Sequence, residues 1–120
     1  MKIQIKRAYE PPSPGDGSRV LVDRVWPRGI TRESLQVDAW LKDLAPSTAL
    51  RKWFAHEPEK WKAFKQRYFK ELDEHPEEIR KLVQRAAAGR LTLVYAARNE
   101  KFNNAAAMKK YIERMMAVHG

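Results

Sequence analysis

A segment near the start of the chain, Arg19–Ile30 (RVLVDRVWPRGI), constrains the fold most strongly. Its apolar run Val20-Leu21-Val22 does not alternate with polar residues, which is typical of a strand covered on both faces. Pro27 and Gly29 then prevent a regular continuation, so the backbone must turn there. We therefore expect the charged and aromatic residues of this segment to gather where a buried strand ends, which is the usual ligand position in open α/β sheets.

A second apolar run, Leu91–Ala97 (LTLVYAA), has the same character. The helices predicted between the two runs supply the crossover that a parallel pair of strands requires. Near the N-terminus, Ile3 and Ile5 alternate with polar residues, which predicts a short strand with one buried face. These patterns predict an α/β fold, a single domain with a short, mostly parallel sheet of three or more strands covered by helices on both faces.

Apolar residues at helical spacing predict the helices that cover this sheet. Thr31 and Ser47 suit the N-caps of two helices, Pro58 suits the first position of another, and Asn103 or Asn104 suits the N-cap of the last. A further helix is expected over Pro76–Ala88, closed by Gly89 as a left-handed C-terminal cap. The residues expected to face the core are Val37, Trp40, Leu41 and Leu44; Leu50, Trp53 and Phe54; Trp61, Phe64, Tyr68 and Leu72; Ile79, Leu82, Val83 and Ala86; and Ala105, Met108, Ile112 and Met115.

The segment Glu10–Ser18 (EPPSPGDGS) is expected to be a surface loop, because it holds three prolines and two glycines. It is longer than a tight hairpin needs. It serves either as a plain connector or as a lid over the mouth of a pocket.

The composition excludes several classes of protein. The chain of 120 residues has no cysteine, which excludes disulfides, thiolate metal ligands and cysteine nucleophiles. Its N-terminus, MKIQIKRAYE, lacks the apolar core of a signal peptide, and no apolar run approaches the roughly 18 residues of a membrane span, so we expect a cytoplasmic protein without membrane contact. The formal net charge of +9 should draw the protein toward anions.

A binding site is expected at one edge of the sheet. If the two apolar strands are parallel, Asp23 and Tyr95–Arg98 leave the sheet at the same edge, where the last helix also begins. A helix N-terminus offers free N–H groups and partial positive charge, and arginines offer bidentate donors, so the predicted ligand is an anionic small molecule that carries phosphate or carboxylate. The predicted binding residues are Arg24, Arg28 and Arg98 as anion contacts, Asn103 as helix cap and ligand donor, and Trp26 and Tyr95 as walls.

Catalytic groups are scarce in the sequence. Asp23 is the candidate acid or base because it follows directly on a buried strand, although an aspartate among arginines equally suits a structural role that holds an arginine in place. Whether the site turns over a substrate therefore stays open. His56, His75 and His119 form no pair with metal-ligand spacing, so no metal is predicted. There is no phosphate-binding loop, dinucleotide fingerprint or serine elbow. The sequence identifies neither a cofactor nor the oligomeric state.

Nucleic-acid binding through basic helix surfaces is the alternative function. Lysines and arginines decorate the predicted helices and are able to contact phosphates. Acidic residues are interleaved with them, which is the usual pattern of a solvated helix face, so this alternative is the weaker of the two. The basic residues are Lys62, Lys65, Arg67, Lys70, Arg80, Lys81, Arg85, Arg90, Lys109, Lys110 and Arg114.

Three stretches of the chain resemble a known family. RAYEPPSPGDGSRVLVDRVWPRGI, WLKDLAPSTALRKWFAHEPEKW and LTLVYAARNEKFNNAAAMKKYI are together similar to the YeaO-like bacterial family, domain of unknown function 488. The similarity covers most of the chain, and its DR-x-WPRG, LAPS and RKWF elements are specific. It implies a small cytoplasmic α/β protein and gives little indication of function.

The resemblance also shows where this chain departs from the family. Members commonly carry His-Asn-His-Ala before the last helix, whereas this chain has Phe102-Asn103-Asn104-Ala105, so any chemistry of those imidazoles is lost here. Members also tend to have Asp before the proline of HDPEKW, where this chain has Glu57, a poorer helix cap. Carried over by position, the candidate site residues are Asp23, Arg24, Trp26, Arg28, Ser47, Arg51 and Asn103.

Overall fold

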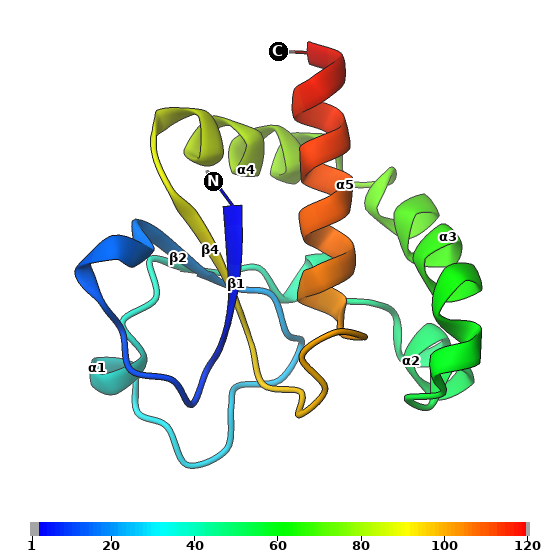
Figure 1. Ribbon diagram of the computed structural model, residues 1–120, viewed down its shortest axis with the longest axis horizontal. Helices are drawn as coiled ribbons and strands as arrows, with labels where there is room; N and C mark the ends of the chain where they lie inside the picture. The colour runs from blue at the N-terminus through cyan, green and yellow to red at the C-terminus, as the bar shows by residue number, and fades with distance from the viewer. Residues whose placement is uncertain (1–2, 120) are drawn as a thin grey trace.

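The protein is built on a four-stranded parallel sheet with the order β1-β4-β2-β3 (Figure 1). The computed structural model describes the backbone of residues 3–119 and the side chains of residues 3–118. The strand β2 pairs in parallel with β4, with Val20 opposite Leu93, so the predicted pairing of the two apolar runs is confirmed. The α/β fold class is confirmed as well. The strands are β1 (Ile3–Arg7), β2 (Ser18–Leu21), β3 (Ala39–Trp40) and β4 (Leu91–Tyr95).

The two faces of the sheet are covered differently, and the alternation of side chains along the strands separates them. Val20 and Leu93 belong to a large core, to which most of the helices contribute. Leu21 and Val94 point to the other face, where they form a smaller core with Ala8 and Leu35 under connecting loops and the one-turn helix α1. The helices are α1 (Arg32–Leu35), α2 (Thr48–Phe54), α3 (Trp61–Leu72), α4 (Pro76–Ala88) and α5 (Asn104–His119).

Most of the predicted helix ends are confirmed. The hydroxyl oxygens of Thr31 and Ser47 accept hydrogen bonds from the backbone N–H groups of Ser34 and Leu50, each at 3.1 Å. Asn103 caps α5, because its side-chain oxygen accepts from the N–H of Ala106 at 2.8 Å. The left-handed cap at Gly89 is wrong, because its φ of 171° is extended backbone.

The predicted helix over residues 31–44 is also wrong. Only the α-helix α1 and a 3-10 turn over Lys42–Leu44 form there, and Gln36 ends α1 in the left-handed conformation with φ 54°. The chain then becomes the edge strand β3, whose Trp40 lies opposite Leu21 of β2. Hydrogen bonds from the N–H of Asp38 to the carbonyl of Arg19 and from the N–H of Leu41 to the carbonyl of Leu21 continue this pairing, so pairing with the sheet overrides the helical spacing of apolar residues.

The loop before β2 is anchored to the sheet at its C-terminal end. It contains a short 3-10 turn over Pro14–Asp16, and the Asp16 side chain is only 2% exposed. Gly17 approaches the backbone of the residue before β4 so closely that a Cβ atom would lie 2.2 Å from the carbonyl oxygen of Arg90. Only glycine fits there, which fixes the loop against the sheet.

No helix within residues 3–119 has the length and apolar character needed to cross a membrane.

Candidate functional site

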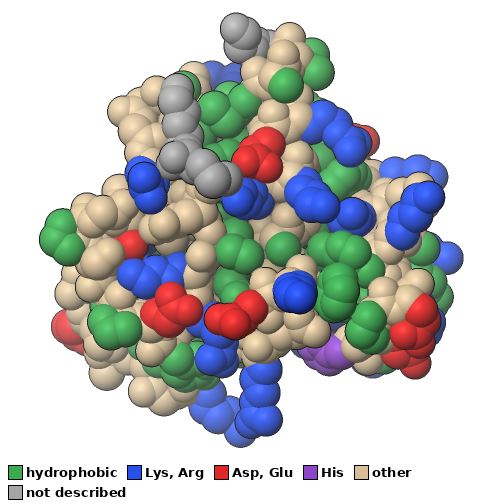
Figure 2. All heavy atoms as spheres, in the orientation of Figure 1, with side chains coloured by type: hydrophobic (Ala, Val, Ile, Leu, Met, Phe, Trp, Pro, Cys, Tyr) green, Lys and Arg blue, Asp and Glu red, His purple; other side chains and the backbone are tan. Residues whose placement is uncertain are grey.

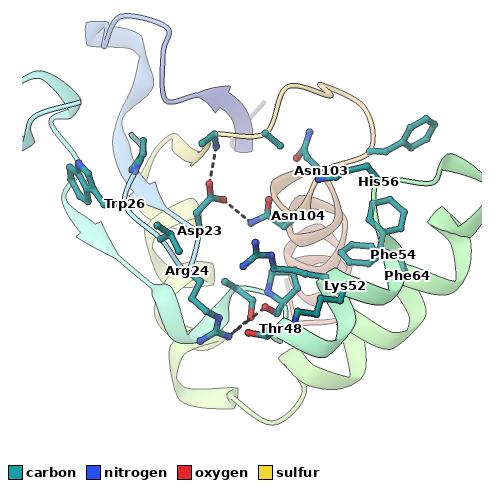
Figure 3. A pocket seen from close by; sticks show the side chains of 18 of the residues that line it. Asp23, Arg24, Trp26, Thr48, Lys52, Phe54, His56, Phe64, Asn103 and Asn104 are labelled. Atoms are coloured by element: carbon teal, nitrogen blue, oxygen red, sulfur yellow. Dashed lines mark hydrogen bonds between the residues drawn. The ribbon is translucent and has the colours of Figure 1, made fainter. Parts of the chain in front are cut away.

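A cavity of about 550 Å³ opens at the carboxyl edge of the sheet, where the sequence predicts a site (Figure 3). We call it the strand-exit cavity. Six parts of the chain meet there, namely the turn after β1, the segment after β2, the helix α2 with the residues on either side of it, the helix α3, the loop after β4 and the start of α5. Its lining residues are Tyr9, Asp23, Arg24, Val25, Trp26, Pro27, Arg28, Ala45, Pro46, Thr48, Arg51, Lys52, Phe54, His56, Phe64, Ala96, Ala97, Phe102, Asn103 and Asn104.

Asp23 lies at the centre of this edge and ties three elements together. One carboxylate oxygen accepts a hydrogen bond from the N–H of Ala96 at 2.9 Å, and the other accepts from the side-chain amide of Asn104 at 3.0 Å (Figure 3). Burial raises the pKa of Asp23 above its ordinary value of 3.8, although these two hydrogen bonds and the charge of Arg51 oppose that shift. Asp23 has no ion pair with an arginine among the described residues, so its structural role is to join β2, β4 and α5.

The two asparagines at the start of α5 make different hydrogen bonds at this edge of the sheet. The amide of Asn104 donates to Asp23 and also to the carbonyl of Val22 at 3.0 Å, so it holds the end of β2. Asn103 is only 3% exposed, and its amide donates to the carbonyl of Asn99 at 2.9 Å while its oxygen caps the helix. Both side chains therefore fix the N-terminus of α5 against the cavity.

Cationic side chains predominate around the cavity. Arg24, Arg28, Arg51 and Lys52 line it, whereas Asp23 is the one carboxylate among the described lining residues. A terminal nitrogen of Arg24 lies 3.3 Å from the carbonyl oxygen of Ala45. The buried Nε of Arg24 has no hydrogen-bond partner among the described residues, which is rare for a buried polar atom.

Three of the predicted site residues lie outside the cavity lining. Ser47 caps α2, and its hydroxyl and N–H both donate to the carboxylate of Glu71, at 2.6 Å and 2.8 Å. Tyr95 is buried within the core beneath the sheet edge, and Arg98 is exposed on the loop after β4. Trp26 does border the cavity, but its ring packs edge-on against Trp40 at 5.5 Å, and its N–H donates to the carbonyl of Ile30.

The sequence interpretation places Arg51 of α2 at the site but misses Thr48 and Lys52 of the same helix and the aromatic lining. Thr48, Arg51 and Lys52 have the spacing i, i+3, i+4, which places them on one face of a helix. Because the family resemblance already places Arg51 at the site, this spacing could have indicated Thr48 and Lys52 as well. The sequence predicts Phe54 and Phe64 in the core and shows Phe102 only as a difference from the family pattern. Phe54 and Phe64 reach the cavity because α2 packs against α3, which the sequence does not show.

Nothing in the cavity resembles a metal centre. Among the described residues no three His, Cys, Asp or Glu side chains lie close enough together to hold a metal ion. His56 lies at the cavity and His75 lies before α4, while the side chain of His119 is outside the described part of the chain.

The fold and the cavity define a class, namely a small α/β protein with a parallel sheet and a cation-lined cavity at the carboxyl ends of its strands. A family model described as the inactive DUF488-N3 subclade matches residues 2–120. The chain is 41% identical over 115 residues to the uncharacterized protein YeaO of Escherichia coli (strain K12), covering 96% of this chain and all of the relative. The protein is therefore a YeaO-like member of the DUF488 family.

Relatives also occur in mycobacteria. The uncharacterized proteins Rv3073c of Mycobacterium tuberculosis (strain H37Rv) and Mb3100c of Mycobacterium bovis are each 40% identical over 113 residues. Each alignment covers 92% of this chain and 93% of the relative. No solved structure gives a significant match.

Proposed function

We propose that this protein is a cytoplasmic binding protein that holds an anionic small molecule, bearing phosphate or carboxylate, in the strand-exit cavity. The observation that carries the proposal is the imbalance of charge in the lining. Four cationic side chains face one carboxylate, and both oxygens of that carboxylate already accept hydrogen bonds within the protein. An anion is the simplest ligand that balances such a lining.

Two further features support an anion at this place. The N-terminus of the 16-residue helix α5 borders the cavity and contributes partial positive charge there. Among the described residues, the guanidinium of Arg24 contacts only carbonyl oxygens, those of Ala45 and Pro46, so an anion is able to balance its charge.

Binding without turnover is the form of the function that we favour. Asp23 is the candidate acid or base, but it is already engaged by the backbone of Ala96 and by Asn104. The matching subclade is described as inactive. The resemblance also implies histidines at the positions of Phe102 and Asn104, and neither replacement supplies a group that titrates near neutral pH.

A thermal-shift measurement with inorganic phosphate tests this function, using Arg28→Ala against Arg98→Ala. Both arginines are exposed and lie near the same edge, but only Arg28 lines the cavity. Phosphate at a hundred times its dissociation constant should stabilise the protein by about 2.7 kcal/mol and raise its Tm by roughly ten degrees. We expect this shift to persist in high salt, to disappear in Arg28→Ala and to remain in Arg98→Ala. Equal shifts in the two variants, or no shift in the unmodified protein, would contradict the proposal.

Nucleic-acid binding is the second candidate, and a cluster of cations between α3 and α5 favours it. Lys62 and Lys65 of α3 lie near Lys110 and Arg114 of α5, and on the face in Figure 2 Lys and Arg side chains gather over these helices. None of these four residues belongs to the ion pairs formed within the described residues. Burial, and then the charges of these neighbours, lower the pKa of Lys65, so the cluster gathers positive charge that a phosphate backbone would relieve.

The salt dependence of binding to a short DNA duplex separates the two candidates. If the cluster between α3 and α5 binds phosphates, Lys110→Glu should weaken binding and reduce the slope of log affinity against log salt by about 0.9 for each phosphate that the variant no longer neutralises. Lys81→Glu on α4 is the matched control with the same change of charge on another helix. Equal weakening by both variants would indicate general attraction to a basic protein and would remove this candidate.

A further inference from the structure

The lining of the strand-exit cavity includes two chemically different groups of side chains, one cationic and one aromatic. The cations Arg24 and Arg28 come from the segment after β2, and Arg51 and Lys52 come from α2. An aromatic part is formed by Phe54, Phe64 and Phe102, of which Phe102 is half-buried and the other two are 6% and 3% exposed. In Figure 3, Phe54, Phe64 and His56 lie together on one side, and Asp23 and Arg24 lie on the other.

The aromatic wall is held in place by its own packing. The rings of Phe54 and Phe64 lie 4.5 Å apart, and Trp61 packs behind them, with its ring 5.5 Å from Phe64. Trp61 also contacts the ring of Phe102 at 5.4 Å, so residues from α2, α3 and the loop before α5 form one aromatic cluster. The rings of this cluster that line the cavity are preformed, so a ligand contacts them at little cost in conformational entropy.

The size of the cavity also exceeds what a small inorganic anion needs. A volume of about 550 Å³ lies within the range of pockets that enclose organic ligands. Phosphate bound at the arginines would leave water against the aromatic wall. Apolar surface next to a few converging charged groups is the usual composition of a site for an organic ligand with one charged end.

We propose that the ligand is an anion joined to an aromatic ring, with its charged group at Arg24, Arg28 and Arg51 and its ring against Phe102 and Phe54. This inference rests on the proposed function, because it names the class of anion that the same cavity accepts. Aromatic rings pair with one another more favourably than apolar groups of equal area do. The wall therefore selects an aromatic group over a saturated one.

Calorimetric titration with three phosphates tests the inference. Inorganic phosphate reports the charged part alone, phenyl phosphate adds an aromatic ring, and cyclohexyl phosphate adds a saturated ring of similar size. We expect phenyl phosphate to bind at least tenfold more tightly than inorganic phosphate, and more tightly than cyclohexyl phosphate.

Phe102→Ala and Phe69→Ala form a matched pair of variants. Each phenylalanine is half-buried and packs against one aromatic ring, Trp61 for Phe102 and Tyr111 for Phe69, but only Phe102 lines the cavity. Phe102→Ala should remove the advantage of phenyl phosphate and leave the affinity for inorganic phosphate unchanged. Phe69→Ala should change neither affinity. Phe102→Leu, which keeps apolar volume without the ring, replaces Phe102→Ala if that variant does not fold.

The outcomes separate this inference from the proposed function. If inorganic phosphate binds in an Arg28-dependent way and phenyl phosphate binds no more tightly, the aromatic inference is wrong and the anion site stands. If cyclohexyl phosphate equals phenyl phosphate, the wall accepts apolar groups in general and the aromatic selection is wrong. If none of the three phosphates binds, both proposals are overturned.

Discussion

Two aspartates next to β2, Asp16 before the strand and Asp23 after it, show how differently the protein uses the same side chain. Asp16 is enclosed by cations, with its carboxylate 2.7 Å from Arg19 and 3.1 Å from Lys6. Asp23 is held by neutral donors, the N–H of Ala96 and the amide of Asn104. Burial favours the neutral form of both groups, but hydrogen bonds from Ser13, Lys6 and Arg19 hold the pKa of Asp16 well below its usual range, whereas the pKa of Asp23 is raised.

The two aspartates differ in whether a neighbouring arginine forms an ion pair with the carboxylate. Arg19 is only 4% exposed, and its guanidinium is satisfied by Asp16 and by the carbonyls of Leu35 and Gln36. At the cavity, Arg24, Arg28 and Arg51 have no carboxylate partner among the described residues. Arginines near an aspartate therefore indicate a ligand site only where other groups donate the hydrogen bonds to that aspartate, because the arginines are then left without a carboxylate partner.

The largest expected effect is the loss of stability in Asp16→Asn. Every group that contacts the Asp16 carboxylate is a donor, so the amide nitrogen of asparagine would face another donor, and Lys6 and Arg19 would lose their counter-charge. We expect the free energy of unfolding to fall by about 3–5 kcal/mol, measured by chemical denaturation. Glu77→Gln, which breaks an exposed ion pair with Arg80, is the control and should have no measurable effect. A decrease in Asp16→Asn as small as in that control would remove the contrast between the two aspartates.

These two regions also show what the sequence could and could not predict. The edge that carries Asp23 was predictable, because an unbroken apolar run ends there and a second one ends beside it in the parallel pairing. The partners of Asp16 were not predictable, since Gln4 and Lys6 come from β1 and Arg19 comes from β2, two strands that lie on either side of β4. Local spacing carries no information about such long-range contacts.

The same distinction explains the errors in the helices and in the site. The strand β3 has only two residues, and its pairing with β2 decides its conformation, so periodicity alone predicts a helix there. Resemblance to the family places Ser47 at the site, but Glu71 of α3, 24 residues away, holds it outside the cavity. The arginine-rich segment after β2 is correctly expected at the cavity, since its position follows directly from the strand before it.

A smaller effect is expected from Asp23→Asn. Asparagine keeps one oxygen for Ala96 or Asn104 but presents its amide NH2 group to the other donor, so one hydrogen bond is removed without leaving a buried cation unpaired. We expect a decrease of roughly 1–2 kcal/mol in the free energy of unfolding at neutral pH. A decrease equal to that of Asp16→Asn would show that Asp23 balances the cavity arginines after all, which would contradict the proposed anion site.

The pH dependence of these two variants should have opposite signs. The folded pKa of Asp16 is lowered from 3.8, so its contribution to stability is present above that value and is lost as the pH falls through the folded pKa. The folded pKa of Asp23 is raised from 3.8, so its contribution is present below that value and is lost as the pH rises through the folded pKa. Between about pH 3 and pH 7, the deficit of Asp16→Asn relative to the unmodified protein should therefore grow with pH, while that of Asp23→Asn should shrink. Denaturation curves measured across this range test both signs, and parallel trends would contradict the comparison.

The smallest effect on stability is expected from Arg51→Gln. This variant tests most directly how the charge in the cavity acts on Asp23. Arg51 is exposed, and its charge lowers the pKa of Asp23 without a direct ion pair, so its removal should raise that pKa further and leave stability nearly unchanged. The Asp23 carboxyl resonance followed by carbon NMR during a pH titration measures this shift, and Arg98→Gln outside the cavity is the control. Saturating inorganic phosphate should raise the pKa of Asp23 in the same direction, because a bound anion cancels the same positive charge. If Arg51→Gln raises this pKa and phosphate does not, the charge of Arg51 reaches Asp23 but no anion binds between them, and the cations at the strand ends serve the fold alone.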